Sequence, residues 1–316
     1  MPLTSRSMTT DDIPQVVDLL LLDAEERRAK DPVLWKVAED ARARIEAALV
    51  FALTAMNQPI RQFWQVACDQ GRISGVIHSM LLPVPPIYAG AKGEPGLILA
   101  DTCISGNAPD GTAEALVDAA ETALRGAGAR IILASFVTGE TWREGLARRG
   151  YQPLTLYLSH NDFGGQPAPV DVRPAREADI PGIVSRSAKH RRMLFNIDPF
   201  WETHPDADPR FASWMARSLT FCDRDMLVSA PDDGLNGYVI AQPATQMHFP
   251  PAHEIEGTGV IDDFYHPDFA HPTAIDAGGR GATAMLRAAE AAFARRGKAA
   301  AFMADKFVFP GGAVDD

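Results

Sequence analysis

The pattern of apolar and polar positions in the first half of this chain alternates between a helical period and short apolar runs. The expected helices cover residues 12–28, 32–56, 110–125 and 140–149. The expected strands cover residues 63–68, 73–82, 97–104, 130–137 and 151–158. Gln70-Gly71 between the first two strands is a hairpin signal, and Gly126, Gly128 and Gly150 mark the ends of the later helices. The pattern predicts a mixed α/β domain with a central sheet.

The second half shows the same order of elements. The expected strands are 170–173, 225–229, 238–242, 259–265 and 299–303. The expected helices are one that starts at Asp179, one over 209–219 and one over 281–296. Two halves with one order of elements suggest a duplication.

Four landmarks support the duplication. An Asp-Ile-Pro run opens each half, at residues 12–14 and 179–181. An Asp-Pro pair followed by a tryptophan begins 19 residues after the start of each run: Asp31-Pro32 with Trp35 in the first half, and Asp198-Pro199 with Trp201 in the second. The remaining landmarks are Ser74-Gly75 and Asn236-Gly237, Pro85-Pro86 and Pro250-Pro251, and the apolar runs that end at Asp101 and Asp262. The sequence therefore predicts two tandem domains, 1–160 and 170–316, joined by a Gly/Pro-rich linker over 161–169.

Composition and charge narrow the function classes. The chain has 316 residues, 46% of them hydrophobic, which is enough for two buried cores. We expect a cytoplasmic protein, because there is no signal-peptide core, no apolar run long enough to cross a membrane, and only Cys68, Cys103 and Cys222, which favour neither disulfides nor a metal site. A net charge of −11, with no basic run longer than a pair, argues against nucleic acid and is compatible with an amine substrate.

The strongest motif lies between a predicted strand and a predicted helix. It is the segment Asp276-Ala277-Gly278-Gly279-Arg280-Gly281-Ala282, directly before Thr283. Glycines allow close backbone approach, and the free N–H groups of a helix N-terminus attract anions such as a pyrophosphate. The alternative is a plain glycine-rich cap.

The order of strand, two helices, antiparallel meander, then helix, strand, helix and strand resembles that of the GCN5-related N-acetyltransferase family in both halves. Gly279 and Gly281 match the glycine positions of the family's Gln/Arg-x-x-Gly-x-Gly/Ala fingerprint, and Asp276 departs from it. The resemblance implies acetyl-CoA as co-substrate, without a metal, held by Gly278, Gly279, Arg280, Gly281, Ala282 and Thr283. In the first half, Pro109 and Asp110 make the corresponding loop poor for phosphate.

The same resemblance places the reaction beside the strand that precedes this loop. Asp262, Asp263 and His266 are candidate bases, Tyr265 is a candidate acid for the leaving thiolate, and an amide near Phe264 is expected to polarise the thioester. Consecutive strand residues face opposite ways, so only one of the two aspartates can face the reaction. Each of these residues has a structural alternative as a loop cap or turn former.

A second candidate region is expected between the first two helices of the second half. The resemblance implies that His190, Arg191, Arg192, Phe195 and Asn196 line the acceptor site, whereas the alternative is a solvated helix end. Trp35 and Trp201 match each other in the repeat and are expected in the cores.

Two departures from the family leave three functions open. The first half has Leu146 where the family often has a tyrosine, and the second half, with residues 306–316 after its last predicted strand, is expected to lack the final helix and strands. The first half, a second copy of the chain or the tail is expected to cover the resulting open sheet edge. The leading function is transfer of an acetyl group to a primary amine of a small molecule or peptide. The alternatives are a non-catalytic tandem module that binds an acyl-CoA or another ligand, and a structural or dimerising pseudoenzyme.

Overall fold

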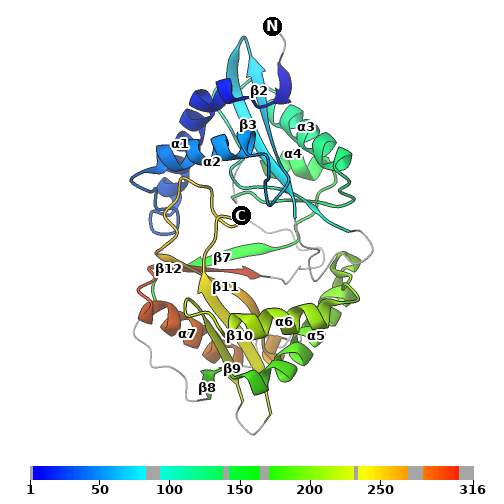
Figure 1. The fold of residues 1–316 in the computed structure, drawn as a ribbon, viewed down its shortest axis with the longest axis vertical. Helices are drawn as coiled ribbons and strands as arrows, with labels where there is room; N and C mark the ends of the chain where they lie inside the picture. The colour runs from blue at the N-terminus through cyan, green and yellow to red at the C-terminus, as the bar shows by residue number, and fades with distance from the viewer. Residues whose placement is uncertain are drawn as a thin grey trace. The chain divides into compact units, whose positions relative to one another are not determined.

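The structure is a computed structural model that describes residues 3–82, 93–137, 142–163, 171–230, 234–269 and 280–305. The chain divides into two compact units, Met1–Gln152 with Thr245–Glu254, and Pro153–Ala244 with Ile255–Asp316. Each unit contains one six-stranded sheet with helices packed against it (Figure 1). The expected mixed α/β architecture with two sheets is confirmed.

The first unit has a mostly antiparallel sheet in the order β1-β2-β3-β4-β6, with β5 paired to β3. Its strands are β1 (Thr4–Ser7), β2 (Gln62–Asp69), β3 (Arg72–Leu81), β4 (Gly96–Ile98), β5 (Cys103–Ile104) and β6 (Ile132–Ala134). Its helices are α1 (Ile13–Lys30), α2 (Ala41–Thr54), α3 (Thr112–Gly126) and α4 (Trp142–Arg148). Buried residues of α1 and α2 form one core with Trp64 and Val76, and those of α3 and α4 form another with Ile77 and Ile98. The helices therefore cover both faces of the sheet.

The second unit has the sheet order β7-β12-β11-β10-β9-β8. Its strands are β7 (Leu156–His160), β8 (Val172–Pro174), β9 (Asp225–Ser229), β10 (Gly237–Pro243), β11 (Thr258–Tyr265) and β12 (Ala300–Asp305). Its helices are α5 (Ile180–Ile197), α6 (Ala207–Ser218) and α7 (Arg280–Arg295). Met285 and Phe293 of α7 pack against Val239 and Ile261 on one face of the sheet. On the other face, the ring of Phe211 in α6 lies 6.2 Å from that of Tyr238 in β10.

The repeated Asp-Ile-Pro landmark has a structural cause. Asp12 and Asp179 stand at the entrance of α1 and α5, and each accepts two hydrogen bonds from an arginine six residues earlier, at 2.6 and 2.7 Å from Arg6 and at 2.7 and 2.9 Å from Arg173. The hydrogen bonds from Arg6 lower the pKa of Asp12 to about 2, and those from Arg173 lower the pKa of Asp179. The same ion pair thus fixes the entry into the first long helix of each half.

The second predicted helix begins later than its apolar spacing suggested. The sequence predicted helix over 32–56, whereas α2 starts at Ala41. The amide of Ala38 donates to the carbonyl of Ala252 at 2.9 Å, and the amide of Glu254 donates to the carbonyl of Lys36 at 2.7 Å. Bonding with the distant segment Thr245–Glu254 therefore replaces the first turns of the predicted helix.

The predicted strand over 97–104 is interrupted. Ser79 pairs with Ile98 and Val76 pairs with Cys103, so four residues, 99–102, lie opposite only two residues of β3. The two extra residues break the ladder and separate β4 from β5.

β7 completes the sheet of the second unit (Figure 1). The sequence assigned a strand over 151–158 to the first domain, but β7 pairs antiparallel with β12, from Leu156↔Asp305 to His160↔Ala301. Three candidates were expected to cover the open sheet edge: the first half, a second copy of the chain and the tail. In the structure, β7, which lies in the first half of the chain, pairs with β12 at this edge. It supplies backbone partners that β12 requires, because Ala301 and Phe302 of the paired stretch are buried.

Proline substitutions test the β7–β12 pairing. Successive N–H groups in a strand point in opposite directions, so one of Leu158→Pro and Ser159→Pro removes a ladder hydrogen bond and the other serves as its control. We expect one variant to lose about 1–3 kcal/mol of unfolding free energy and the other to lose less. Urea denaturation followed by circular dichroism measures the difference, and two unaffected variants would contradict the pairing.

The segment Thr245–Glu254 contributes a buried histidine to the first unit. The His253 ring is fully buried 5.1 Å from that of Trp35, and its Nδ1 lies 3.2 Å from the carbonyl oxygen of Trp35. A carbonyl only accepts, so Nδ1 carries the proton. Burial, together with the charge of Arg27, lowers the pKa of His253 to about 4.

Acid should therefore weaken the first unit through His253. The folded state favours the neutral ring, and an unfolded histidine titrates near pH 6.5, so the stabilisation is complete above that pH and is lost as the pH falls toward 4. Protonation of His253 alone should lower the unfolding free energy by about 2 kcal/mol when the pH falls from 8 to 5. Chemical denaturation of wild type and His253→Gln at both pH values measures it, with His160→Gln, at an exposed site, as control. An equal pH dependence in all three proteins would contradict this assignment.

Candidate active site

The candidate site lies where β11 continues past its parallel neighbour. β11 and β12 pair from Thr258↔Ala300 to Ile261↔Met303, and β11 then runs on to Tyr265 paired with β10. The end of β11 is therefore bonded to β10 on one side and has no β12 partner in this register on the other. This stretch holds the predicted catalytic residues.

A β-bulge separates the two candidate aspartates. Ile240 pairs with Asp263 and Ala241 pairs with Ile261, so Asp262 is the extra residue. Asp263 occupies a regular position of the ladder, whereas Asp262 occupies the bulge.

Asp263 faces the side of the sheet that carries α5 and α6. The next residue, Phe264, packs against the α7 core, and successive side chains alternate between faces. The Tyr238 hydroxyl, on the α6 side, donates to Asp263 Oδ2 at 2.8 Å. The amide of Phe264 donates to Asp263 Oδ1 at 3.0 Å. Asp263, a candidate base, thus already accepts a hydrogen bond from the Phe264 amide. The resemblance implies that this same amide would polarise the thioester.

His266 lies between the end of β11 and the start of α7. A Cβ at Gly281 would lie 2.3 Å from His266 Cε1, so only glycine leaves room for this ring. The ring is buried, and burial lowers the pKa of His266, against the opposing effect of Asp268. His266 Nδ1 accepts from the amide of Asp268 at 3.2 Å, as a neutral imidazole can.

Asp268 occupies the N-terminus of α7. Its Oδ2 accepts from the amides of Gly281 at 2.9 Å and Ala282 at 3.2 Å. The sequence predicted that these amides bind the pyrophosphate of the coenzyme. In the structure, the group at this helix end is a carboxylate of the chain itself. Sequence reasoning missed Asp268 because it lies 13 residues before Gly281.

Of the remaining predicted loop residues, two are described by the structure and two are not. Gly278 and Gly279 lie outside the described residues. Arg280 is the first residue of α7, and both Arg280 and Thr283 are exposed.

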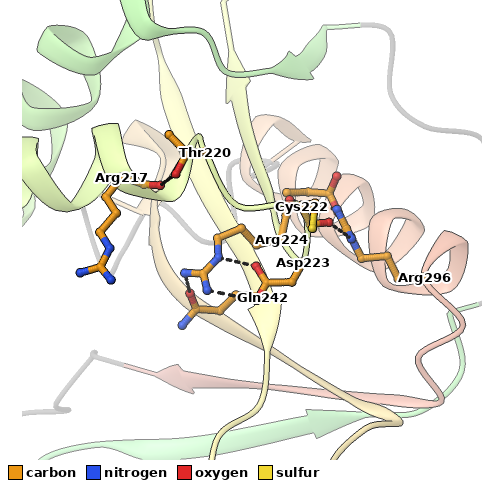
Figure 2. Close-up of polar contacts among 8 residues, drawn as sticks. Arg217, Thr220, Cys222, Asp223, Arg224, Gln242 and Arg296 are labelled. Atoms are coloured by element: carbon orange, nitrogen blue, oxygen red, sulfur yellow. Dashed lines mark hydrogen bonds and ion pairs between the residues drawn. The ribbon is translucent and has the colours of Figure 1, made fainter.

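The opposite end of α7 is fixed by Arg296 (Figure 2). Its guanidinium donates to the Asp225 carboxylate at 2.5 Å and to the carbonyl oxygens of Cys222 at 2.7 Å and Arg224 at 3.0 Å. Arg224 in turn donates to the side chain of Gln242 in β10 at 2.8 Å. These bonds hold the C-terminal end of α7 to β9 and to the segment before it.

The predicted acceptor segment lies inside a helix, not between two helices. His190, Arg191, Arg192, Phe195 and Asn196 belong to the last turns of α5, which ends at Ile197. The expected position was wrong because the helical pattern continues up to the Asp198-Pro199 pair. His190 and Arg191 are buried, while Arg192, Phe195 and Asn196 are exposed.

Two members of this segment have defined contacts. The His190 ring lies 5.9 Å from that of Tyr265 and so adjoins the end of β11. Arg191 donates to Ser187 Oγ at 2.5 Å and to Asp208 of α6, with its guanidinium 5.7 Å from the ring of Phe211. Arg191 therefore connects α5 to α6.

The corresponding helix of the first unit also has an acidic residue in its first turn. Gly111 precedes α3 with a φ of 85°, and Glu114 in the first turn accepts from its own amide. This bond, together with Arg148, lowers the pKa of Glu114. The sequence had judged this loop poor for phosphate because of Pro109 and Asp110.

The first unit contains a buried polar cluster that sequence reasoning missed. His78 Nδ1 lies 2.9 Å from both carboxylate oxygens of Asp101, and Trp64 stacks on the His78 ring at 3.9 Å. Asp101 was noted only as a repeat landmark. No local signal reveals the cluster, because strand pairing joins residues 23 positions apart.

Within the part of the chain that the structure describes, no group of three or more His, Cys, Asp or Glu side chains could hold a metal ion. Among the same residues, no helix is long and apolar enough to cross a membrane. Trp201 is buried and Trp35 is partly buried, as expected for core residues.

One of the solved structures similar to this chain shares its architecture over nearly the whole length. A GCN5-related N-acetyltransferase from Sphaerobacter thermophilus superposes with a TM-score of 0.54 and 14% identity, over 98% of this chain and 89% of that one. A tandem GNAT protein from the clavulanic acid biosynthesis pathway gives a TM-score of 0.49 and 14% identity, over 96% and 90%. A predicted acetyltransferase from Clostridium acetobutylicum, solved with acetyl-CoA, gives 0.38 and 14%, over 48% and 91%.

No protein-family model and no curated protein matches the sequence. The likeness therefore lies in the fold. Its nearly complete coverage agrees with the repeated elements and the two sheets described above. The chain has the tandem GCN5-related N-acetyltransferase fold.

Proposed function

We propose that this protein is an acyl-CoA-dependent N-acetyltransferase that moves an acetyl group from acetyl-CoA to a primary amine of a small molecule or peptide. The observation that carries the proposal is the arrangement at the end of β11. There Asp263 faces α5 and α6, and the amides of the α7 N-terminus follow directly beyond His266.

The chemistry assigns a role to each group. The amine nitrogen attacks the thioester carbon, a C–N bond forms and the C–S bond breaks. Asp263 takes the proton from the amine, directly or through water, and its hydrogen bond from Tyr238 holds it in place. The leaving thiolate takes a proton from Tyr265 or from solvent. The products are the N-acetylated amine and coenzyme A.

Coenzyme binding requires a rearrangement of two carboxylates. The pyrophosphate would take the amides of Gly281 and Ala282 from Asp268, and the thioester oxygen would take the amide of Phe264 from Asp263. His266 supports this end of α7 by packing against Gly281.

The same contacts favour a second candidate, a non-catalytic tandem module. A carboxylate at the α7 N-terminus repels a phosphate, and in the first unit Glu114 places a carboxylate in the first turn of α3. Titration calorimetry with acetyl-CoA, followed by a thiol-release assay against a panel of amines, separates the two. Binding with release supports the transferase, binding without release supports the module, and no binding overturns the coenzyme site.

Asp263→Asn tests the proposed base. The amide cannot take a proton, so we expect kcat to fall about 100-fold or more while the Kd for acetyl-CoA changes little. Asp262→Asn is the matched control, because Asp262 lies in the bulge, and it should retain most of the activity. Equal losses in the two variants would refute the assignment.

Substitutions at the N-terminus of α7 test the coenzyme position. Asp268→Asn removes a competing negative charge and should tighten acetyl-CoA binding about tenfold, measured by calorimetry at fixed ionic strength. Gly281→Asp places a Cβ against His266 and adds a charge, so binding should be lost. Gly257→Asp, where a Cβ meets no atom within 4 Å, is the control for the added charge. Unchanged affinity in both Asp268→Asn and Gly281→Asp would place the coenzyme elsewhere.

A further inference from the structure

A small cavity lies between α5 and α6, the helices on the Asp263 side of the sheet in the second unit. Its volume is about 180 Å³. It is lined by the last turns of α5, the connection that follows and the first turn of α6, and its polar side chains are Arg191, Arg192, Thr203, His204 and Asp208. The cavity thus brings two arginines of the predicted acceptor segment together with residues that the sequence did not single out.

Arg191 is a buried cation whose partner is exposed. Its side chain is 3% exposed, whereas that of Asp208, the carboxylate it binds, is 59% exposed. A second hydrogen bond goes to Ser187 Oγ at 2.5 Å. A guanidinium has five N–H groups, and among the described residues this one has no further hydrogen-bond partner. A second carboxylate can therefore bind Arg191 beside Asp208 or in its place.

The rest of the lining adds charge and donors. Arg192 is exposed at the cavity, and His204 Nδ1 accepts from the amide of Asp206 at 3.1 Å, so that Nε2 carries a proton and can donate. The Asp206 carboxylate, outside the lining, is paired with Arg210 at 3.4 Å. Two arginines against one aspartate leave the lining positive, on a chain whose net charge is −11. This local reversal of sign favours an anionic ligand.

The first unit shows that the fold does not require these cations. α1 and α5 are both 18 residues long and begin directly after the repeated aspartate, so Arg191 and Arg192 match Ala24 and Glu25. Ala24 is buried, as Arg191 is. A small apolar side chain therefore satisfies the packing at this position, and the arginine pair is particular to the second unit.

Aromatic contacts connect the cavity to the candidate base. The Arg191 guanidinium lies 5.7 Å from the centroid of the Phe211 ring, which lies 6.2 Å from that of Tyr238. The Tyr238 hydroxyl donates to Asp263 at 2.8 Å. We propose that the cavity binds a carboxylate of the amine acceptor, so that the acceptor is an amino acid or a peptide with an acidic side chain. This inference rests on the proposed function and adds the class of substrate.

Titrations without coenzyme test the carboxylate site itself. Nitrogen-15-labelled protein is titrated with glutamate and, as its uncharged match, with glutamine, at fixed ionic strength. A short peptide with a free amino terminus and an internal glutamate, and its glutamine counterpart, form the second pair. We expect the acidic member of a pair to bind about tenfold more tightly and to shift the amide signals of Ala207 and Asp208. The tighter acidic ligand identifies amino acid or peptide, whereas equal affinity within both pairs, or no binding, overturns the inference.

Three exposed side chains provide variants that leave the core intact. Arg192→Gln removes a cation from the cavity and should weaken glutamate binding about three- to tenfold. Asp208→Asn removes the competing charge, keeps an acceptor for Arg191, and should tighten binding by about the same factor. Lys189→Gln removes one charge from α5 outside the lining and should change the affinity less than about twofold. Equal effects of Arg192→Gln and Lys189→Gln overturn the inference.

Acetyl transfer separates this inference from the proposed function. With acetyl-CoA present, thiol release should show a kcat/KM about tenfold higher for the acidic amine of the tighter pair than for its glutamine match. Thiol release without this preference overturns the inference and leaves the transferase intact. Binding of the carboxylate at the cavity without thiol release from any amine contradicts the transferase, whereas the carboxylate site stands.

Discussion

The sheet of the second unit depends on the backbone hydrogen bonds of β12. This strand is parallel to β11 on one side and is buried at Ala301 and Phe302, so an unpaired second edge would leave polar groups without partners. β7 supplies the partners from the preceding sequence repeat. With β12 held, β11 can continue beyond Ile261 beside β10, and the candidate site lies on that extension.

The donors at the candidate site are occupied by the chain's own acids. Asp263 takes the amide of Phe264, and Asp268 takes two amides of α7. Buried or partly buried N–H groups require acceptors in the absence of a ligand, and an adjacent carboxylate is the strongest acceptor a protein can supply. A phosphate that enters this helix end must therefore displace a negative charge.

The two repeats have used the same face of the sheet differently. In the second unit Tyr238 supports the carboxylate of Asp263, whereas in the first unit His78 supports that of Asp101. The His78 ring is buried, stacks on Trp64, and has both nitrogens within hydrogen-bond distance of oxygen atoms of Asp101 and Gln62.

The sequence alone determined the duplication and the order of elements, because these depend on local periodicity and on residues close together in the chain. Asp12 and Asp179 are examples, since each is bonded to an arginine six residues away. The tertiary structure decided what depends on distant partners. Residues 32–40 became a bonded loop because Ala252 and Glu254 meet them, β7 joined β12, and Asp268 and His78 found their partners across loops and strands. Hydrogen bonds between distant segments leave no periodic trace in a single sequence, and for that reason only the folded chain shows them.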